Sequence, residues 1–183
     1  MHPNWPAAWD SGLDCGLKVH GLPWPPANKF HETKVNRALA YKLLVLHGEL
    51  AHTLGLCVFL LWGSEDSCLT PKRMALLYST LTGITMNEFE LMKTAERVWN
   101  LKRCFNVREG LTRKDEKLPK RLLEPIETGP TKDESIKDFD GLLNEYYEAS
   151  GWNKKTGVPT RKKLEELGLK DVADELTKLG YLT

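Results

Sequence analysis

The chain has 183 residues, of which 41% are hydrophobic and 28% are charged, an ordinary balance for one globular domain. Its 26 Lys and Arg face 25 Asp and Glu, so the net charge of +1 gives no reason to expect a nucleic acid or a membrane surface as a partner. No apolar run approaches the roughly 18 to 20 residues that span a bilayer, and the N-terminus lacks the pattern of a secretory signal. We therefore expect a cytoplasmic protein.

Four cysteines, Cys15, Cys57, Cys68 and Cys104, lie too far apart to form any CxxC pair. A chain of this size does not depend on disulfides for its core. They are interpreted as free thiols, unless one of them is a metal ligand.

Residues 1–30 combine five prolines with Trp5, Trp9 and Trp24. Proline blocks regular helix, while tryptophan supplies large apolar anchors. We expect an extended Pro/Trp-rich segment that packs on an apolar surface, in a chain that starts in the middle of a larger architecture. The remaining residues, 31–183, are expected to form one helical domain.

Apolar residues at steps of three and four predict a first helix over residues 33–54, with Thr33 as its N-cap and Gly55 as its left-handed end. Residues 56–62 are apolar on every face and are expected to be buried, either as a short helix or as an extended core segment. Thr70 and Pro71 then open a second long helix, which Gly83 closes.

A third long helix is expected to start from a capping box over residues 85–88 and to run toward Gly110. Its predicted core stripe consists of Phe89, Met92, Ala95, Val98, Leu101 and Phe105. Residues 111–135 are charged and proline-containing, which predicts a long loop. Apolar residues between 136 and 147 mark a further helix, which ends before Gly151. Two short helices follow, around residues 161–167, started by Pro159-Thr160, and 171–179, and they are closed by Gly168 and Gly180. Strand alternation is absent, so the predicted fold is all-α, an irregular multi-helix domain.

The segment 96–121 carries polar residues whose spacing does not follow core periodicity: ERVWNLKRCFNVREGLTRKDEKLPKR. One interpretation is structural, in which side chains tie the helix end to the following loop through bonds to the backbone, with Asp115 as an ion partner. The side chains concerned are Asn100, Arg103, Asn106, Arg108 and Arg113. Alternatively, one of these arginines reaches a cofactor phosphate or lines a substrate channel.

A second motif, HTLGLC over residues 52–57, follows the first predicted helix. A helix that ends in glycine turns sharply and presents a thiolate, the usual ligand of iron–sulfur clusters. A buried free cysteine that merely fills core space is the simpler alternative. The histidines show no HxxxH or HExxH spacing, and no Ser-His-Asp or phosphate-loop motif is visible.

Both motifs resemble the C-terminal domain of the tungsten-dependent aldehyde ferredoxin oxidoreductases. The resemblance covers about residues 34–183, is strongest over 96–121, and includes Tyr146, Tyr147, Gly151-Trp152 and Pro159-Thr160 in the closing segment. It implies an enzyme that oxidises aldehydes to carboxylic acids and passes electrons to ferredoxin. It also implies a tungstopterin, with tungsten or molybdenum, and a 4Fe–4S cluster.

In that family a motif Asp-x-x-Gly-Leu-Cys occupies the place of residues 52–57. The resemblance implies that Cys57 ligates the cluster and that Leu56 and His52 contact the pterin. His52 stands where the family has Asp, and a neutral imidazole offers one acceptor where a carboxylate offers two oxygens. Glu49 lies one turn earlier on the same helix face and is a candidate to supply the carboxylate instead.

The family's other cluster ligands come from a CxxCxxxC stretch, which this chain lacks. The chain alone is therefore expected to bind no cluster and to be inactive, and the other ligands are expected from upstream domains or from a separate chain. The alternative is a non-catalytic helical subunit or a degenerate remnant of the family.

Overall fold

The computed structural model describes residues 37–61, 69–129, 132–133, 135–136 and 138–182. Within these residues the chain forms six α-helices and three short 3₁₀ turns, and no strand is present there. The all-α prediction is confirmed. The predicted extended segment 1–30 and the Thr33 cap lie outside the described residues.

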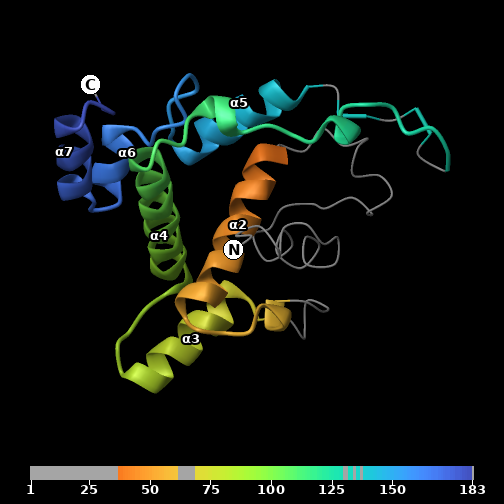
Figure 1. The fold of residues 1–183 in the computed structure, drawn as a ribbon. Coiled ribbons are helices and arrows are strands. Elements are labelled where there is room, and N and C mark those ends of the chain that lie inside the picture. Colours follow the sequence, from red (N-terminus) through yellow and green to blue (C-terminus); the bar gives the residue numbers. More distant parts are fainter. Residues whose placement is uncertain (1–36, 62–68, 130–131, 134, 137, 183) are drawn as a thin grey trace.

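Two long helices, α2 (Arg37–Thr53) and α4 (Glu88–Arg108), contact each other along the centre of the domain. One end of this pair carries α5 (Phe139–Ser150), which contacts α2, and the other carries α3 (Pro71–Thr82), which packs on α4 (Figure 1). The short helices α6 (Arg161–Glu166) and α7 (Lys170–Lys178) pack together, and α7 contacts α4. The turns are η3 (Val58–Leu61), η4 (Arg113–Asp115) and η5 (Lys120–Leu122).

Helix ends follow the local sequence signals in most places. The hydroxyl of Thr70 accepts a hydrogen bond from the backbone N–H of Arg73 at 3.2 Å, with Pro71 at the first helical position and Gly83 left-handed at φ 73°. The predicted capping box over residues 85–88 is wrong, because the box of α4 joins Asn87 and Glu90. The backbone N–H of each donates to the other's side-chain oxygen, at 2.9 and 3.0 Å, since Asn87 directly precedes the first helical residue.

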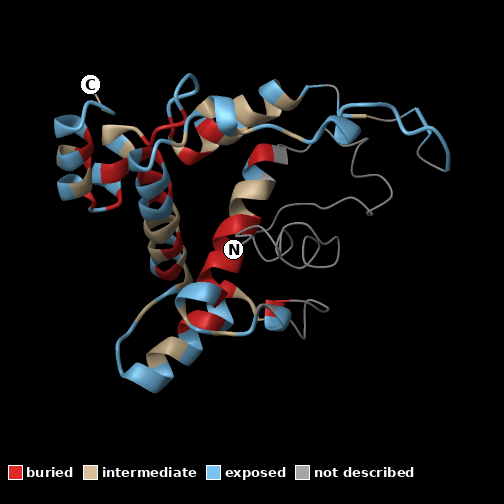
Figure 2. Cartoon of the chain, viewed as in Figure 1, coloured by how far each residue is buried: buried red, intermediate tan, exposed pale blue. Residues whose placement is uncertain are grey.

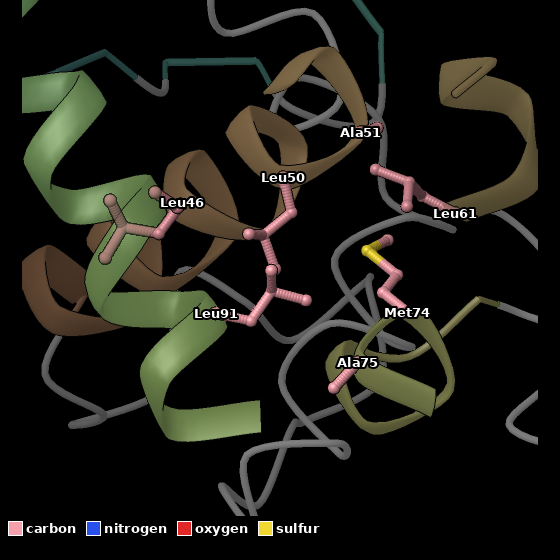
Figure 3. Close-up of a cluster of buried hydrophobic side chains, with 8 residues drawn as sticks. Leu46, Leu50, Ala51, Leu61, Met74, Ala75 and Leu91 are labelled. Atoms are coloured by element: carbon pink, nitrogen blue, oxygen red, sulfur yellow. The ribbon is translucent and has the colours of Figure 1, made fainter. Parts of the chain in front are cut away.

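The core consists of two main clusters of buried apolar side chains. The first lies where α2, α3 and α4 meet and contains Leu46, Leu50, Ala51, Leu61, Met74, Ala75, Leu91 and Ala95 (Figure 3). The second joins α6 and α7 to the C-terminal half of α4 and contains Cys104, Leu164, Leu167, Leu169, Ala173 and Leu176. Figure 2 shows the buried residues along α2 and on the inner sides of α6 and α7.

Two burial predictions are wrong. In the segment 56–62, Phe59 is 60% exposed and Leu60 50% exposed, whereas Leu61 is buried, because a single 3₁₀ turn directs only part of its side chains to the core. On α4, Phe89 and Phe105 are 78% and 55% exposed although they were expected in the core stripe. Leu91 and Ala95 of this helix pack with α2 and α3, whereas Cys104 packs with α6 and α7, so its buried face changes along its length.

Among the helices of the described residues, none combines the length and the apolar character that crossing a bilayer requires.

Candidate functional site at the end of helix α2

The motif 52–57 forms a tight turn at the C-terminal end of α2. Gly55 adopts a left-handed conformation at φ 69°, as predicted, and its N–H donates to the carbonyl of His52 at 3.3 Å. The N–H of Leu56 then donates to the carbonyl of Ala51 at 2.8 Å, which folds the chain back onto the helix. Leu56 packs against the first core cluster, while His52 and Cys57 are exposed. Cys57 is a free, accessible thiol rather than a core residue.

Glu49, one turn before His52, is a buried carboxylate with a defined partner. It is 2% exposed, and the Lys102 ammonium donates to its two oxygens at 2.7 and 2.8 Å. A buried acid requires such pairing, because an isolated charge loses its hydration. The sequence reasoning missed Lys102 although it lies in the segment 96–121. The sequence could indicate only that a glutamate on a buried helix face needs a cationic partner. The packing of α2 against α4 identifies that partner as Lys102.

A large cavity of about 1310 Å³ runs along α2, with Ala38 and Tyr41 lining it near the start of the helix and His52 near its end. Its walls come from α2, α4, α5, α7 and the loop after α4, and most of them are apolar. His52 and Lys102 both line this cavity. The structure therefore brings His52, a predicted site residue, close to the ion-pair partner of Glu49, the other predicted residue on α2. Leu56 and Cys57 lie at the turn that follows His52.

Arg103 is the centre of a second, buried polar cluster. Its Nε donates to the carbonyl of Gly157 at 2.8 Å, and its two terminal nitrogens donate to the Glu116 carboxylate at 2.7 and 3.3 Å. The guanidinium lies over the Trp152 ring at 4.7 Å and over the Tyr147 ring at 5.6 Å. All of these contacts are within the chain, which supports the structural interpretation of Arg103.

The other polar residues of the segment 96–121 divide between the two interpretations. Arg113 donates to the carbonyl of Lys154 at 2.9 Å, and Asn100 both donates to the Glu96 carbonyl at 2.8 Å and accepts from the Trp152 indole at 2.9 Å. These bonds confirm the predicted attachment to the backbone, although they reach the C-terminal segment as well as the loop. Arg108 and Asn106 are exposed at the cavity.

Asp115 is not the ion partner that the sequence suggested. Its carboxylate accepts hydrogen bonds from the backbone N–H and the hydroxyl of Thr112, at 2.8 and 2.7 Å, and so caps its own turn η4. These bonds lower the pKa of Asp115. Glu116, the next residue, faces the core and takes the ionic role with Arg103.

Aromatic rings from α2, α4 and α5 lie around the polar cluster of Arg103. The Trp99 indole donates to the Tyr146 hydroxyl at 2.9 Å, and the Tyr146 ring meets the rings of Tyr41 and Trp152 edge-on at 5.3 and 5.6 Å. Burial raises the pKa of Tyr146 to about 12, so its phenol stays neutral. Trp152 is 5% exposed and closes this side of the core.

The described residues contain no group of three or more His, Cys, Asp or Glu side chains that would hold a metal ion. An accessible thiol after a left-handed glycine fits the place of one thiolate in an iron–sulfur cluster, which in most proteins has four. Cys57 thus fits a shared cluster site, and the described part of this chain does not form a complete one.

The fold of the described residues has a counterpart among solved structures. It is similar to the active site complex BamBC of benzoyl coenzyme A reductase, with a TM-score of 0.67 and 24% identity over 96% of this chain and 28% of that one. The family model "Aldehyde ferredoxin oxidoreductase, domains 2 & 3" matches residues 2–169. The chain belongs to the aldehyde ferredoxin oxidoreductase family, and the resemblance inferred from the sequence is confirmed.

Curated relatives support the same assignment. The tungsten-containing aldehyde ferredoxin oxidoreductase of Thermococcus kodakarensis is 35% identical over 133 residues, which is 70% of this chain and 21% of that protein. The enzyme of the same name from Pyrococcus furiosus is 34% identical over the same shares. The WOR-like subunit of the Pyrococcus furiosus aliphatic sulfonate oxidoreductase is 33% identical over 69 residues, 37% of this chain and 11% of that one. The chain spans about a fifth of the length of the tungsten-containing relatives.

Proposed function

We propose that the chain is the C-terminal portion of a tungstopterin and iron–sulfur oxidoreductase that oxidises aldehydes to carboxylic acids and uses ferredoxin as electron acceptor. The observation that carries this proposal is the exposed Cys57 thiol directly after the left-handed Gly55, in a chain of this family. The names of the tungsten-containing relatives support the metal and the reaction. Free thiols suit the reducing environment of the cytoplasm, where we place the enzyme.

In this proposal Cys57 binds one iron of a 4Fe–4S cluster, which supplies one-electron transfer when bound. Leu56 and His52 border the pterin, with His52 on the cavity wall. Glu49 acts through Lys102, because both carboxylate oxygens are already bound to the ammonium. An ammonium has three N–H donors, so Lys102 keeps one for a ligand in the cavity. The chain thus contributes a thiolate, an imidazole and a positioned cation.

The remaining cluster ligands come, in this proposal, from upstream domains or a separate chain that carries CxxCxxxC. The described residues alone hold no metal-binding group of sufficient size. By itself the chain is expected to be inactive, and the aldehyde and ferredoxin sites belong to the assembled enzyme.

The test is to co-express the chain with the polypeptide that carries CxxCxxxC, and to measure iron, tungsten and molybdenum content and the cluster absorbance. We expect Cys57→Ser to lose the cluster absorbance and Cys68→Ser, the matched control without an assigned role, to keep it. Equal cluster content in both variants would exclude Cys57 as a ligand. Glu49→Gln is expected to lower the pterin metal content, since Lys102 loses its ionic partner, and unchanged content would remove Glu49 from the site.

A non-catalytic subunit or a degenerate remnant is the rival function, and the replacement of the family's Asp by His52 favours it. That rival predicts a chain that purifies stable, monomeric and colourless and acquires no metal during co-expression. Metal bound in the wild-type complex but not in the Cys57→Ser complex would exclude it.

A further inference from the structure

The loop after α4 contains a segment with few ties to the helices. This segment, residues 117–129 and called the strap, follows the turn η4 and lines the large cavity with Lys117 and Leu118. Within the described chain, its hydrogen bonds join it only to itself and to other loop residues, never to an α-helix. Figure 1 shows its far part, beyond η5, extending away from the other helices. Long loops of this kind in compact domains are usually functional, for example as lids.

Solvent exposure shows that the strap is weakly held. All of residues 119–129 are exposed, and the apolar side chains of Leu122, Leu123 and Ile126 are 42 to 45% exposed. A segment with few buried apolar contacts and solvent-exposed hydrogen bonds opens at a low free energy. The strap contributes no residue to the two main core clusters, so it can leave the cavity wall without unpacking either of them.

Glu116, directly before the strap, ties it to the helices. Its carboxylate accepts hydrogen bonds from both terminal nitrogens of Arg103 on α4, at 2.7 and 3.3 Å. The two side chains differ in burial, because Arg103 is 6% exposed and Glu116 is 25% exposed. Arg103 also donates to the Gly157 carbonyl at 2.8 Å and lies over the Trp152 ring, so it stays in place when the pair breaks. Glu116 regains water, and the pair therefore opens from the side of the strap.

Contacts on either side of the strap give it fixed ends. Before it, Arg113 donates to the Lys154 carbonyl at 2.9 Å. After it, Asp138 caps α5 by accepting a hydrogen bond from the backbone N–H of Gly141 at 2.8 Å. A segment that is held at both ends and released in between moves as a flap, since a few loop residues near its ends absorb the backbone rotation.

We propose that the strap is a lid on the large cavity and that the pair of Glu116 and Arg103 is its latch. The structure shows the latched state, in which Leu118 forms part of the cavity wall. When Glu116 leaves Arg103 for water, the strap moves away and this part of the wall opens. The inference rests on the proposed function for one point, the identity of the ligand that enters the cavity beside His52. The opening itself needs no bound group.

Limited trypsin digestion of the full chain measures the opening, with cleavage after Lys117 followed by mass spectrometry. A protease cuts an extended segment, so the rate follows the population of the open strap. We expect Glu116→Ala to be cut at least about tenfold faster than wild type, because the loss of a hydrogen bond between charged groups shifts the opening equilibrium by about that factor.

The matched control for this digestion is Glu124→Ala. Glu124 is exposed on the same strap and forms no ion pair among the described residues, so its variant is expected to be cut at the wild-type rate. Each rate is divided by that of a synthetic peptide of residues 111–124 with the same substitution. This division removes the direct effect of a nearby carboxylate on trypsin.

Entry of nile red, an uncharged apolar dye, measures whether the opening exposes the cavity. We expect its association rate in stopped-flow fluorescence to rise in Glu116→Ala and to keep the wild-type value in Glu124→Ala. Phe105→Glu places a charge on the cavity wall and is expected to weaken dye binding. Only the dye signal that Phe105→Glu removes is assigned to the cavity.

Three results would overturn the lid: equal cleavage of Glu116→Ala and Glu124→Ala, faster cleavage without faster dye entry into the cavity, or an equal increase of cleavage within α4, which would indicate general unfolding. If circular dichroism shows that Glu116→Ala does not fold, Glu116→Gln replaces it. Glutamine has a similar volume and keeps a neutral acceptor, so this variant is expected to fold and still to be cut faster than wild type. A rate equal to that of wild type would then overturn the latch.

These measurements use the chain alone and need no metal, so they separate this inference from the proposed function. A strap that opens in Glu116→Ala, in a chain that acquires no iron or tungsten during co-expression, keeps the lid and rejects the proposed function. A metal-loaded complex of a chain in which Glu116→Ala leaves cleavage unchanged keeps the function and rejects the lid.

Discussion

Replacing Arg103 by Met tests whether the segment 96–121 has a structural role. The buried guanidinium donates to the Gly157 carbonyl and to both oxygens of Glu116, and it lies over the rings of Trp152 and Tyr147. Methionine fills a similar length of apolar space but supplies no donor and no charge. The variant therefore removes the polar contacts with the smallest possible cavity.

The expected loss follows from these contacts. A hydrogen bond from a charged donor to the Gly157 carbonyl contributes about 1.5 to 3 kcal/mol, and a desolvated cation over aromatic rings contributes about 2 kcal/mol. Glu116 adds little further cost, because it is 25% exposed and regains water. The sum, roughly 3 to 5 kcal/mol, agrees with the measured cost of breaking buried ion pairs. For a chain of this size it lowers Tm by about 6 to 20 °C.

Thermal and urea denaturation monitored by circular dichroism measure this loss. The control is Arg108→Met on the same helix, because Arg108 is 45% exposed and its pairs with Glu109 and Glu175 are long, 3.4 and 3.7 Å. Exposed pairs contribute about 0 to 1 kcal/mol, so the control is expected to melt within a few degrees of wild type. If both variants lose the same stability, the structural role of Arg103 is refuted. A stable Arg103→Met that fails only to bind cofactor in the complex would instead assign Arg103 to the cofactor.

Two further predictions concern Gly157 and Glu96. Gly157 is left-handed at φ 72°, and an added Cβ would collide with the Arg103 guanidinium and lie 2.8 Å from the Tyr147 hydroxyl. Gly168 has a similar φ but open space around it. Gly157→Ala should therefore lower the unfolding free energy more than Gly168→Ala. Equal urea midpoints for the two alanine variants would contradict this clash. Burial by itself would raise the pKa of Glu96, but hydrogen bonds and the charges of Lys42 and Lys163 outweigh it and lower the pKa. Because the pKa of Glu96 is lowered in the fold, ionised Glu96 stabilises the fold above pH 4.5, its ordinary pKa, and this contribution is lost as the pH falls through the pKa of the folded state. Glu96→Gln should therefore flatten the acid side of the plot of stability against pH. An unchanged slope would argue against the ion pairs of Glu96 with Lys42 and Lys163.

Local signals placed the helices in the sequence with fair accuracy. Thr70, Pro71 and Gly83 bound α3 as predicted, since a cap depends on residues within one turn of the helix end. Gly151, Gly168 and the Thr160 cap likewise mark ends that the structure confirms. The capping box of α4 was displaced by two residues, because both Thr85 and Asn87 are acceptable caps and the packing of the preceding turn decides between them.

The family also followed from the sequence, because the segment 96–121 and the motif 52–57 have a spacing that core periodicity does not produce. Which face of each helix is buried did not follow. Phe59, Phe89 and Phe105 were expected in the core and are exposed, because burial depends on which other helices reach that side.

The sequence by itself determined the helical class and the family, and it predicts Cys57 as a metal ligand, which stays a prediction. The tertiary structure alone decided that Glu49 binds Lys102 and that Arg103 binds Glu116 rather than Asp115. The physical reason is the distance along the sequence between the residues that interact. Caps and turns are fixed by neighbours in sequence, whereas the partner of a buried charge is set by helices that cross far along the chain, and no local pattern specifies that crossing.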